Sequence, residues 1–101
     1  MFKYTEEQIK AWKEKWGENN VFVAIVDDKC CVLHKPRRQD YSYAMVASNG
    51  GKDPVKLQEA LLNGCWIDGD NEIKTEDSYF FAVSAQIEGM SEVKQAELKK
   101  L

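Results

Sequence analysis

The longest regular pattern of hydrophobic and polar positions lies in the last third of the chain, residues 75–101. Apolar residues recur there at three- and four-residue spacing, which is typical of one face of a helix. They are Phe80, Val83, Ile87 and Met90. Beyond Ser91 the chain is mostly charged, with a thin apolar stripe of Val93, Ala96 and Leu101. With Thr75 as its cap and no break at Gly89, this helix would be roughly 40 Å long. The pattern therefore predicts a long C-terminal helix with a buried start and an end that is free to meet a partner.

A second helical pattern opens the chain. Thr5 and Gln8 have the spacing of a capping box, in which each side chain bonds the backbone N–H of the other residue. The apolar stripe that follows consists of Ile9, Trp12 and Trp16. Gly17 stands where a helix usually ends. These features predict an N-terminal helix.

The pattern changes at Asn20 to continuous apolar runs. Residues 21–26 are rich in β-branched side chains, and residues 30–34 form a second apolar run that Pro36 ends. A short polar turn separates the two runs, so the sequence predicts a β-hairpin over about residues 20–35. Both strands carry apolar side chains on both faces, and an isolated hairpin is marginal in water. Helices must cover the hairpin, and a third strand or a partner chain beside it remains open.

Two shorter helices are expected between the hairpin and the last third. Asp40 can cap the first, over residues 41–48, and Asp53 with Pro54 can open the second. The second has a buried face of Leu57, Ala60 and Leu61 and ends at residues 63–64. A short apolar segment, 65–67, and a polar turn lead to the last helix. The sequence predicts a single α+β domain over residues 1–101, with an N-terminal helix, a β-hairpin, then three to four helices.

Length, charge and cysteine content limit the classes of function. A chain of 101 residues can build one core without disulfides. Its net charge of −3 argues against a nucleic-acid partner, because such binding depends on neutralising phosphates. No apolar run long enough for a membrane span or a signal peptide is present. Three cysteines, two of them adjacent, make a poor disulfide framework, so we expect reduced thiols and a cytoplasmic protein.

The cysteines and the single histidine are the candidates for chemistry. Cys30 and Cys31 should point to opposite faces of a strand, and His34 lies roughly 13 Å along the strand from Cys30. No spacing of paired ligands supports zinc, and a nucleophile needs its base within hydrogen-bond reach. Pairing of Cys65 with His34 is a guess from sequence. We therefore expect buried structural cysteines, no catalytic residue, no metal and no cofactor.

Two charged segments invite a functional interpretation. The acidic stretch that starts at Asp68 resembles a calcium loop, but its sixth and twelfth positions are Ile73 and Tyr79, where an EF-hand needs Gly and Glu. A turn is the better interpretation. The basic cluster of Lys35, Arg37 and Arg38 has no basic continuation, so we expect a solvated link that could position an acidic partner segment.

Aromatic residues are the candidates for an interface. Tryptophan and tyrosine are common anchors of protein interfaces. A domain of this size need not bury all of Trp12, Trp16, Trp66, Tyr41 and Tyr43. The residues expected to bind a partner are Arg37, Arg38, Tyr41, Trp66, Met90, Val93 and Leu101.

Several segments together resemble a known class of small phage proteins. Residues 31–40 carry a basic-Pro-x-Arg-x-Asp segment after the hairpin, and residues 61–66 read Leu-Leu-Asn-Gly-Cys-Trp. A Gly-Asp turn at 69–70 and a charged C-terminal segment complete the succession over about residues 20–101. This succession resembles the tail assembly chaperones of long-tailed bacteriophages and prophages. The aromatic first helix and the well-formed hairpin depart from that class, whose members are mainly helical.

The resemblance implies a protein that coats the helical tape measure protein until tail tube subunits replace it. Such a protein would act without catalysis, by reversible binding through its C-terminal helix and hairpin faces, and could form a homo-oligomer. The alternative is a structural subunit or adaptor of the virion that assembles through the hairpin edge. A third hypothesis is an enzyme or a nucleic-acid modulator that uses Cys65, His34 or the Arg37 and Arg38 pair.

Overall fold

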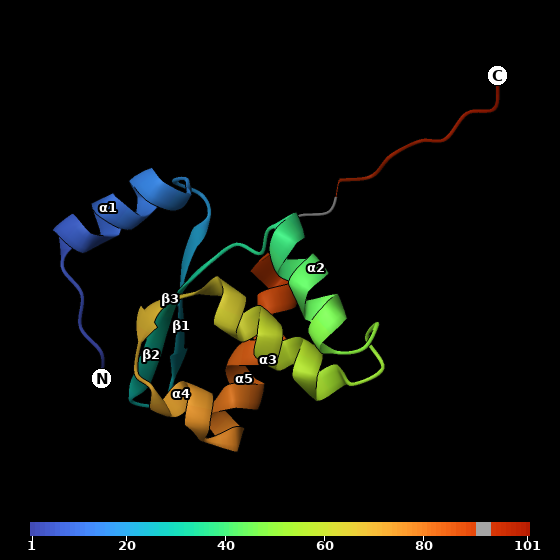
Figure 1. Ribbon diagram of the computed structural model, residues 1–101. Helices are drawn as coiled ribbons and strands as arrows, with labels where there is room; N and C mark the ends of the chain where they lie inside the picture. Colours follow the sequence, from blue (N-terminus) through green and yellow to red (C-terminus); the bar gives the residue numbers. More distant parts are fainter. Residues whose placement is uncertain (91–93) are drawn as a thin grey trace.

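The computed structural model of the protein describes residues 1–90 and 94–101. It is an α+β fold in which an N-terminal helix precedes a β-hairpin, and helices pack around an antiparallel sheet (Figure 1). The elements in chain order are α1 (Glu6–Trp16), β1 (Val21–Val26), β2 (Lys29–His34), α2 (Arg38–Ala47), α3 (Pro54–Cys65), β3 (Trp66–Gly69), α4 (Glu72–Thr75), α5 (Asp77–Ile87) and the 3-10 helix η1 (Glu88–Met90). The predicted fold class is confirmed.

The predicted ends of α1 are confirmed by its hydrogen bonds. Thr5 Oγ1 accepts from the backbone N–H of Gln8 at 3.2 Å, and Gln8 Oε1 accepts from the N–H of Thr5 at 2.8 Å. Gly17 ends the helix with φ of +102°, a conformation that other residues rarely adopt.

The predicted hairpin is confirmed, and a third strand joins it on the far side of β2. Residues Val21 to Val26 of β1 pair antiparallel with β2, and β3 pairs with β2 as well, so the order in the sheet is β1-β2-β3. The apolar segment predicted at residues 65–67 is divided, because Cys65 ends α3 and Trp66 begins β3. β2 is the central strand, which explains its apolar residues on both faces.

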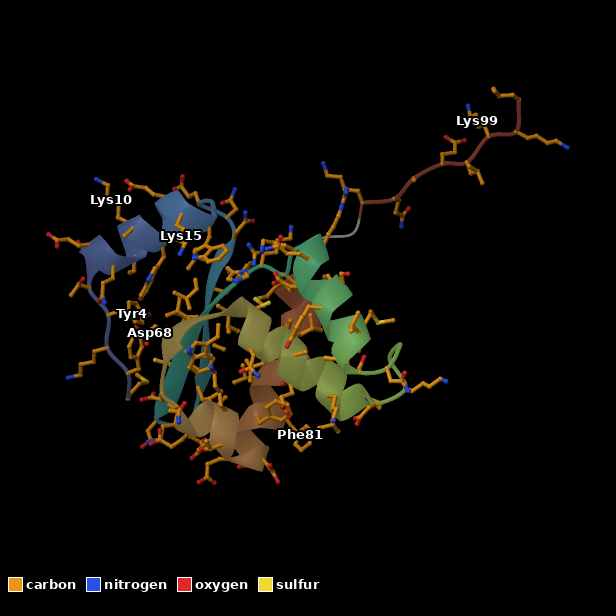
Figure 2. The ribbon with its side chains drawn as sticks, in the orientation of Figure 1. Tyr4, Lys10, Lys15, Asp68, Phe81 and Lys99 are labelled. Atoms are coloured by element: carbon orange, nitrogen blue, oxygen red, sulfur yellow. The ribbon has the colours of Figure 1, made fainter. Side chains whose placement is uncertain are left out.

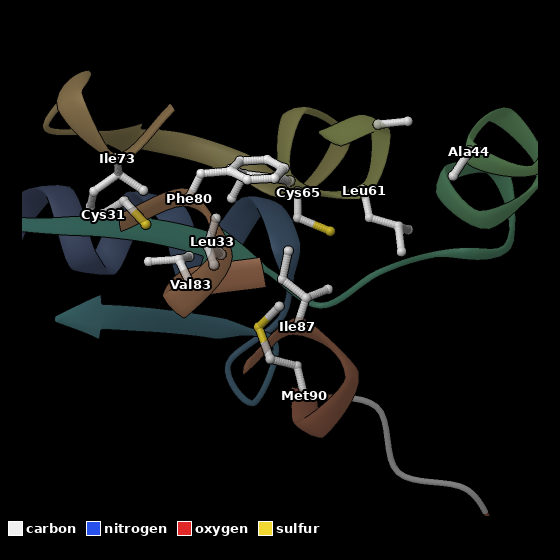
Figure 3. Packing of buried hydrophobic residues seen from close by; sticks show 12 residues of the cluster. Cys31, Leu33, Ala44, Leu61, Cys65, Ile73, Phe80, Val83, Ile87 and Met90 are labelled. Atoms are coloured by element: carbon white, nitrogen blue, oxygen red, sulfur yellow. The ribbon is translucent and has the colours of Figure 1, made fainter. Parts of the chain in front are cut away.

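The core lies on one face of the sheet. Alternate residues of β2 point to opposite faces, so Cys31 and Leu33 enter the main cluster with α3 and α5 (Figure 3). The cluster of buried residues comprises Cys31, Leu33, Ala44, Ala60, Leu61, Leu62, Cys65, Ile73, Phe80, Val83, Ile87 and Met90. On the opposite face of β2, His34 is covered by the end of α1, where its ring is stacked on Trp16.

The two middle helices differ from the predicted bounds. The Asp53 cap is confirmed, with its side chain accepting from the N–H of Lys56 at 3.1 Å. The proposed Asp40 cap is wrong: α2 begins at Arg38, and Asp40 lies in its first turn, where its carboxylate accepts from the N–H of Arg37 at 2.8 Å. The predicted end of α3 at residues 63–64 is also wrong. Gly64 lies inside α3, where a Cβ would be only 3.2 Å from Asp40 Oδ1, so glycine there permits close packing of α2.

The predicted long C-terminal helix is wrong. Thr75 belongs to α4, α5 runs from Asp77 to Ile87, and residues 94–101 are exposed and carry no helix. Figure 2 shows Lys99 on this tail, away from the folded body. The predicted buried face is confirmed, and the last helix that the structure describes, η1, ends at Met90. Residues 94–101 are all exposed, so a helix there would bury no surface, and isolated short helices are marginal in water. Val93 lies outside the described residues.

Among the described residues, every helix is too short or too polar to cross a membrane.

Candidate functional site

The two most exposed large apolar side chains of the folded body, Val46 and Tyr43, lie on α2. One side of this helix packs on α3 through Asp40, Ala44 and Ser48, which are spaced by four residues and buried. The remaining surface of α2 carries large apolar side chains, which we call the α2 face. They are Tyr41, Tyr43, Met45 and Val46, with exposed fractions of 38%, 67%, 45% and 80%. Figure 1 places α2 at the outside of the fold, beside α3.

The α2 face consists of two stripes. Arg38, Tyr41 and Met45 recur at three- and four-residue spacing, as do Tyr43 and Val46 on the other flank. Beside the second stripe, α2 and α3 enclose a shallow hollow of about 270 Å³. The hollow is lined by Tyr43, Ala47, Lys56, Glu59, Ala60 and Asn63. An apolar centre with a charged rim is the usual composition of a protein interface.

The side chain of Arg37 is held against the fold by contacts with Asp40 and Trp16. Its Nε lies 3.1 Å from Asp40 Oδ2 and its Nη2 lies 3.2 Å from Oδ1, while its guanidinium lies 5.0 Å from the ring centre of Trp16. Burial alone would raise the pKa of Asp40, but the hydrogen bonds and the charge of Arg37 outweigh burial and hold that pKa below its ordinary value. Arg38 is exposed and lies in line with Tyr41, so the part of the basic cluster that faces solvent on α2 is Arg38.

A second apolar surface lies between β1 and α5. It is a groove of about 530 Å³, which we call the edge groove. Its lining residues are Phe22, Val23, Ala24, Ile25, Val26, Leu33, Ala82, Val83, Gln86, Gly89 and Met90. Of the predicted partner-binding residues in the described chain, Met90 alone lines it, and Met90 is itself 8% exposed.

The predicted partner-binding residues therefore do not form one surface. Arg37, Arg38 and Tyr41 lie together at the start of α2. Trp66 is half-buried on β3, with Lys74 Nζ 4.3 Å from its ring centre. Leu101 is fully exposed at the end of the tail.

Sequence reasoning missed Met45 and Val46. Residues 41–47 are apolar on all sides of a short helix, so periodicity could not say which residues α3 covers. The available signal was that an uncharged helical stretch, whose only side-chain polar groups are the hydroxyls of Ser42 and the two tyrosines, cannot bury every side in a small fold.

The structure brings three chemically active side chains together at the junction of β2, α2 and α3. Ligand atoms of His34, Asp40 and Cys65 lie within 4.8 Å of one another, and all three residues are buried. The pairing of His34 with Cys65 was a guess from sequence, and Asp40 was not expected there. His34 Nδ1 lies 3.0 Å from the carbonyl oxygen of Lys35, a partner that often orients a ligating histidine.

The bonding of this cluster favours a structural role. Burial, with a smaller effect of the Asp40 charge, raises the pKa of the Cys65 thiol to about 12, so the thiol stays protonated at neutral pH and is a poor nucleophile. Both oxygens of Asp40 already accept from Arg37. A cation at this place would have to displace Arg37 and find a fourth ligand.

The acidic turn that resembles a calcium loop also uses its carboxylates internally. Asp68 Oδ1 accepts from the N–H of Gly69 at 2.9 Å. Asp70 Oδ2 accepts from the N–H groups of Phe2 and Cys30, each at 2.9 Å, and these bonds, that of Phe2 first, lower the pKa of Asp70. Asp70 thereby fastens the N-terminal segment to the sheet.

Comparison of the chain with family models, with curated proteins and with solved structures gives no match.

Proposed function

We propose that the chain is a non-catalytic protein-binding module of the phage tail assembly chaperone type, which holds a helical segment of another tail protein, such as the tape measure protein, against the α2 face. The observation that supports this best is the exposure of that face, where Val46 is 80% and Tyr43 is 67% exposed. Contiguous exposed apolar side chains usually mark an interaction site. Tyrosine is among the residues that contribute most to binding energy.

The resemblance to tail assembly chaperones supports the choice of partner. The Arg37-Arg38-Gln39-Asp40 segment, which carries part of that resemblance, forms the start of α2. The α2 face continues directly from it. A helical client fits this surface, because an amphipathic helix can lay its apolar stripe along the stripes of α2 and along the hollow beside α3.

We assign binding to the α2 face and not to the C-terminal helix that the sequence predicted. Residues 94–101 are extended and exposed rather than helical. The tail can still add contacts through Leu98 and Leu101, whose side chains are fully exposed.

Co-purification of the tagged protein from cells that also express the neighbouring genes tests the proposal. We expect a long helical protein to co-elute with the unmodified chain and expect Val46→Lys to reduce its recovery by about tenfold, because an interface anchor contributes about 1–2 kcal/mol. Val55→Lys is the matched control, since it also replaces an exposed valine on a helix, which is 47% exposed on α3. Equal recovery with Val46→Lys and the unmodified chain would contradict a role for the α2 face.

The second candidate is a structural subunit of the virion. The observation that favours it is the open edge of β1, on which Ile25 is 64% and Val23 37% exposed. Mass spectrometry of purified particles separates the two candidates. A stoichiometric amount in particles supports the structural subunit, whereas abundance in infected cells with loss from particles supports the chaperone.

A further inference from the structure

We infer that two copies of this chain associate by pairing their β1 strands antiparallel about a two-fold axis at Val23, which joins two three-stranded sheets into one of six strands. The surface used is the outer edge of β1 with the edge groove. It is separate from the α2 face, so this inference and the proposed function can fail independently.

The direction of the backbone groups follows from the hairpin register. Asn20 O accepts from the N–H of Lys35 at 2.7 Å, and hydrogen-bonded pairs alternate along an antiparallel ladder. Phe22, Ala24 and Val26 therefore direct their backbone groups toward β2. Val21, Val23 and Ile25 direct theirs outward, which leaves three N–H and three C=O groups along an edge that no other described strand covers.

The edge of β1 lacks the features that usually protect a strand from pairing. Residues 21–26 contain no charge and no proline, and their register with β2 is continuous. The opposite edge of the same sheet differs. β3 has only four residues, its pairing with β2 is irregular between Val32 and Leu33, and it carries Asp68 and Gly69. The β3 edge of the sheet therefore has features that oppose pairing with another strand, whereas the β1 edge has none of them.

The edge of β1 is complementary to itself. With Val23 opposite Val23 of the second copy, Val21 lies opposite Ile25, and every outward N–H meets an outward C=O. Of the two-fold antiparallel registers, this one alone uses all three outward residues. It also places the large ring of Phe22 opposite the methyl group of Ala24, and β-branched side chains opposite one another on the other face. A two-fold interface requires such self-complementarity.

The edge groove has room for the side chains of the second strand. Phe22, Ala24 and Val26 point to the face of the sheet that packs against the core. A paired strand presents the same side chains to the same face, which places its Phe22 and Val26 in the groove of about 530 Å³. The far wall of the groove includes Ala82 and Gly89, whose small size lets another chain approach α5.

Sedimentation equilibrium over a concentration series is the first test. We expect a species of twice 11.6 kDa for the unmodified chain and a species of 11.6 kDa for Ile25→Lys, because a lysine on the edge opposes pairing. Val46→Lys, on the α2 face, should keep the dimer. A monomer at every concentration, or a dimer that persists in Ile25→Lys, would overturn the inference. Capture of a segment of another protein on β1 by a monomeric chain would overturn it as well.

Cysteine cross-linking tests the register. The native cysteines are buried, with exposed fractions of at most 2%, so introduced thiols report on the edge. In the Val23-centred register the two positions 23 are a hydrogen-bonded pair about 5.5 Å apart, which suits a disulfide. Positions 25 of the two copies are about 13 Å apart, beyond disulfide reach.

Mild oxidation of Val23→Cys should therefore give a covalent dimer on a non-reducing gel, while Ile25→Cys stays mainly monomeric. Exposure alone would predict the opposite order of cross-linking, because Ile25 is 64% and Val23 only 37% exposed. Circular dichroism confirms that each variant is folded. Faster cross-linking of Ile25→Cys than of Val23→Cys would overturn the register.

Discussion

The indole ring of Trp16 is stacked on the imidazole ring of His34, with ring centroids 3.9 Å apart and planes 11° from parallel. The contact joins the end of α1 to the end of β2. The carbonyl oxygen of Trp16 also accepts from Asn20 Nδ2 at 2.9 Å, which fixes the link that leads into β1. No residue of α1, which the structure describes in full, is buried, so the helix depends on a few partly exposed aromatic contacts of this kind.

Trp16→Ala should therefore detach α1 without unfolding the sheet. We expect the free energy of unfolding to fall by about 1–3 kcal/mol, since the stack and the half-buried ring are lost together. Hydrogen exchange should show faster exchange of the α1 amides and unchanged protection of β2 and α5. Lys13→Ala, at an exposed position of the same helix, is the control. Unchanged protection of α1 in Trp16→Ala would show that other contacts hold it.

The ion pair between the exposed Arg37 and the buried Asp40 should make stability depend on pH. The pKa of Asp40 is lowered in the fold, so the unfolded chain binds this proton more readily than the native state does. The stabilisation is complete above the unfolded pKa of about 3.9 and is lost as the pH falls through the lower native pKa.

Asp40→Asn should remove that dependence. We expect the free energy of unfolding at neutral pH to fall by about 1–3 kcal/mol, because hydrogen bonds to the charged carboxylate are lost. We also expect a flatter acid limb, which means that stability falls less steeply as the pH drops below about 4. Urea titrations at a series of pH values measure both effects. Glu59→Gln, which alters an exposed carboxylate on α3, should leave the acid limb as it is. If stability falls equally steeply at low pH in Asp40→Asn, groups other than Asp40 cause the fall.

The three thiols should be unreactive in the native protein. Burial is the main cause that raises the pKa of Cys31 and of Cys65 to about 12, and it also raises the pKa of Cys30. At pH 8 Ellman's reagent should react slowly with the folded chain and should titrate three thiols after denaturation. A rapid reaction of one thiol would instead support the hypothesis of a nucleophilic Cys65 beside His34.

The elements that the sequence predicted well are those with local signals. The capping box of Thr5 and Gln8, the cap at Asp53 and the apolar run of β1 depend on residues within a few positions of one another. The start of α2 shows the limit of such signals. An aspartate before a helix and one in its first turn look alike in sequence, and the bond from Arg37 decided the outcome.

The remaining features depend on contacts between distant residues. β3 is four residues long and pairs with a strand more than thirty positions earlier, so Trp66 and Ile67 carry no local sign of it. The C-terminal pattern had helical spacing, but a helix also needs a surface to pack on, and residues 94–101 are all exposed. The α2 face could not be predicted because α3 selects which side of α2 is buried. The open edge of β1 was partly foreseen, since the apolar hairpin left room for a further chain.

Removal of residues 94–101 tests what the tail contributes. Every residue of this segment is exposed, and the ion pair that it makes among the described residues, between Lys99 and Glu97, lies within the tail at 4.0 Å. The free energy of unfolding of the truncated chain should therefore lie within about 0.5 kcal/mol of that of the full chain. The truncated chain should also remain a dimer, because β1 is untouched. If Leu98 and Leu101 contact the client, recovery of the tape measure protein should fall, and Leu98→Ala with Leu101→Ala in the full chain should reproduce that fall. A large drop in the melting temperature of the truncated chain would show instead that the tail packs on the fold.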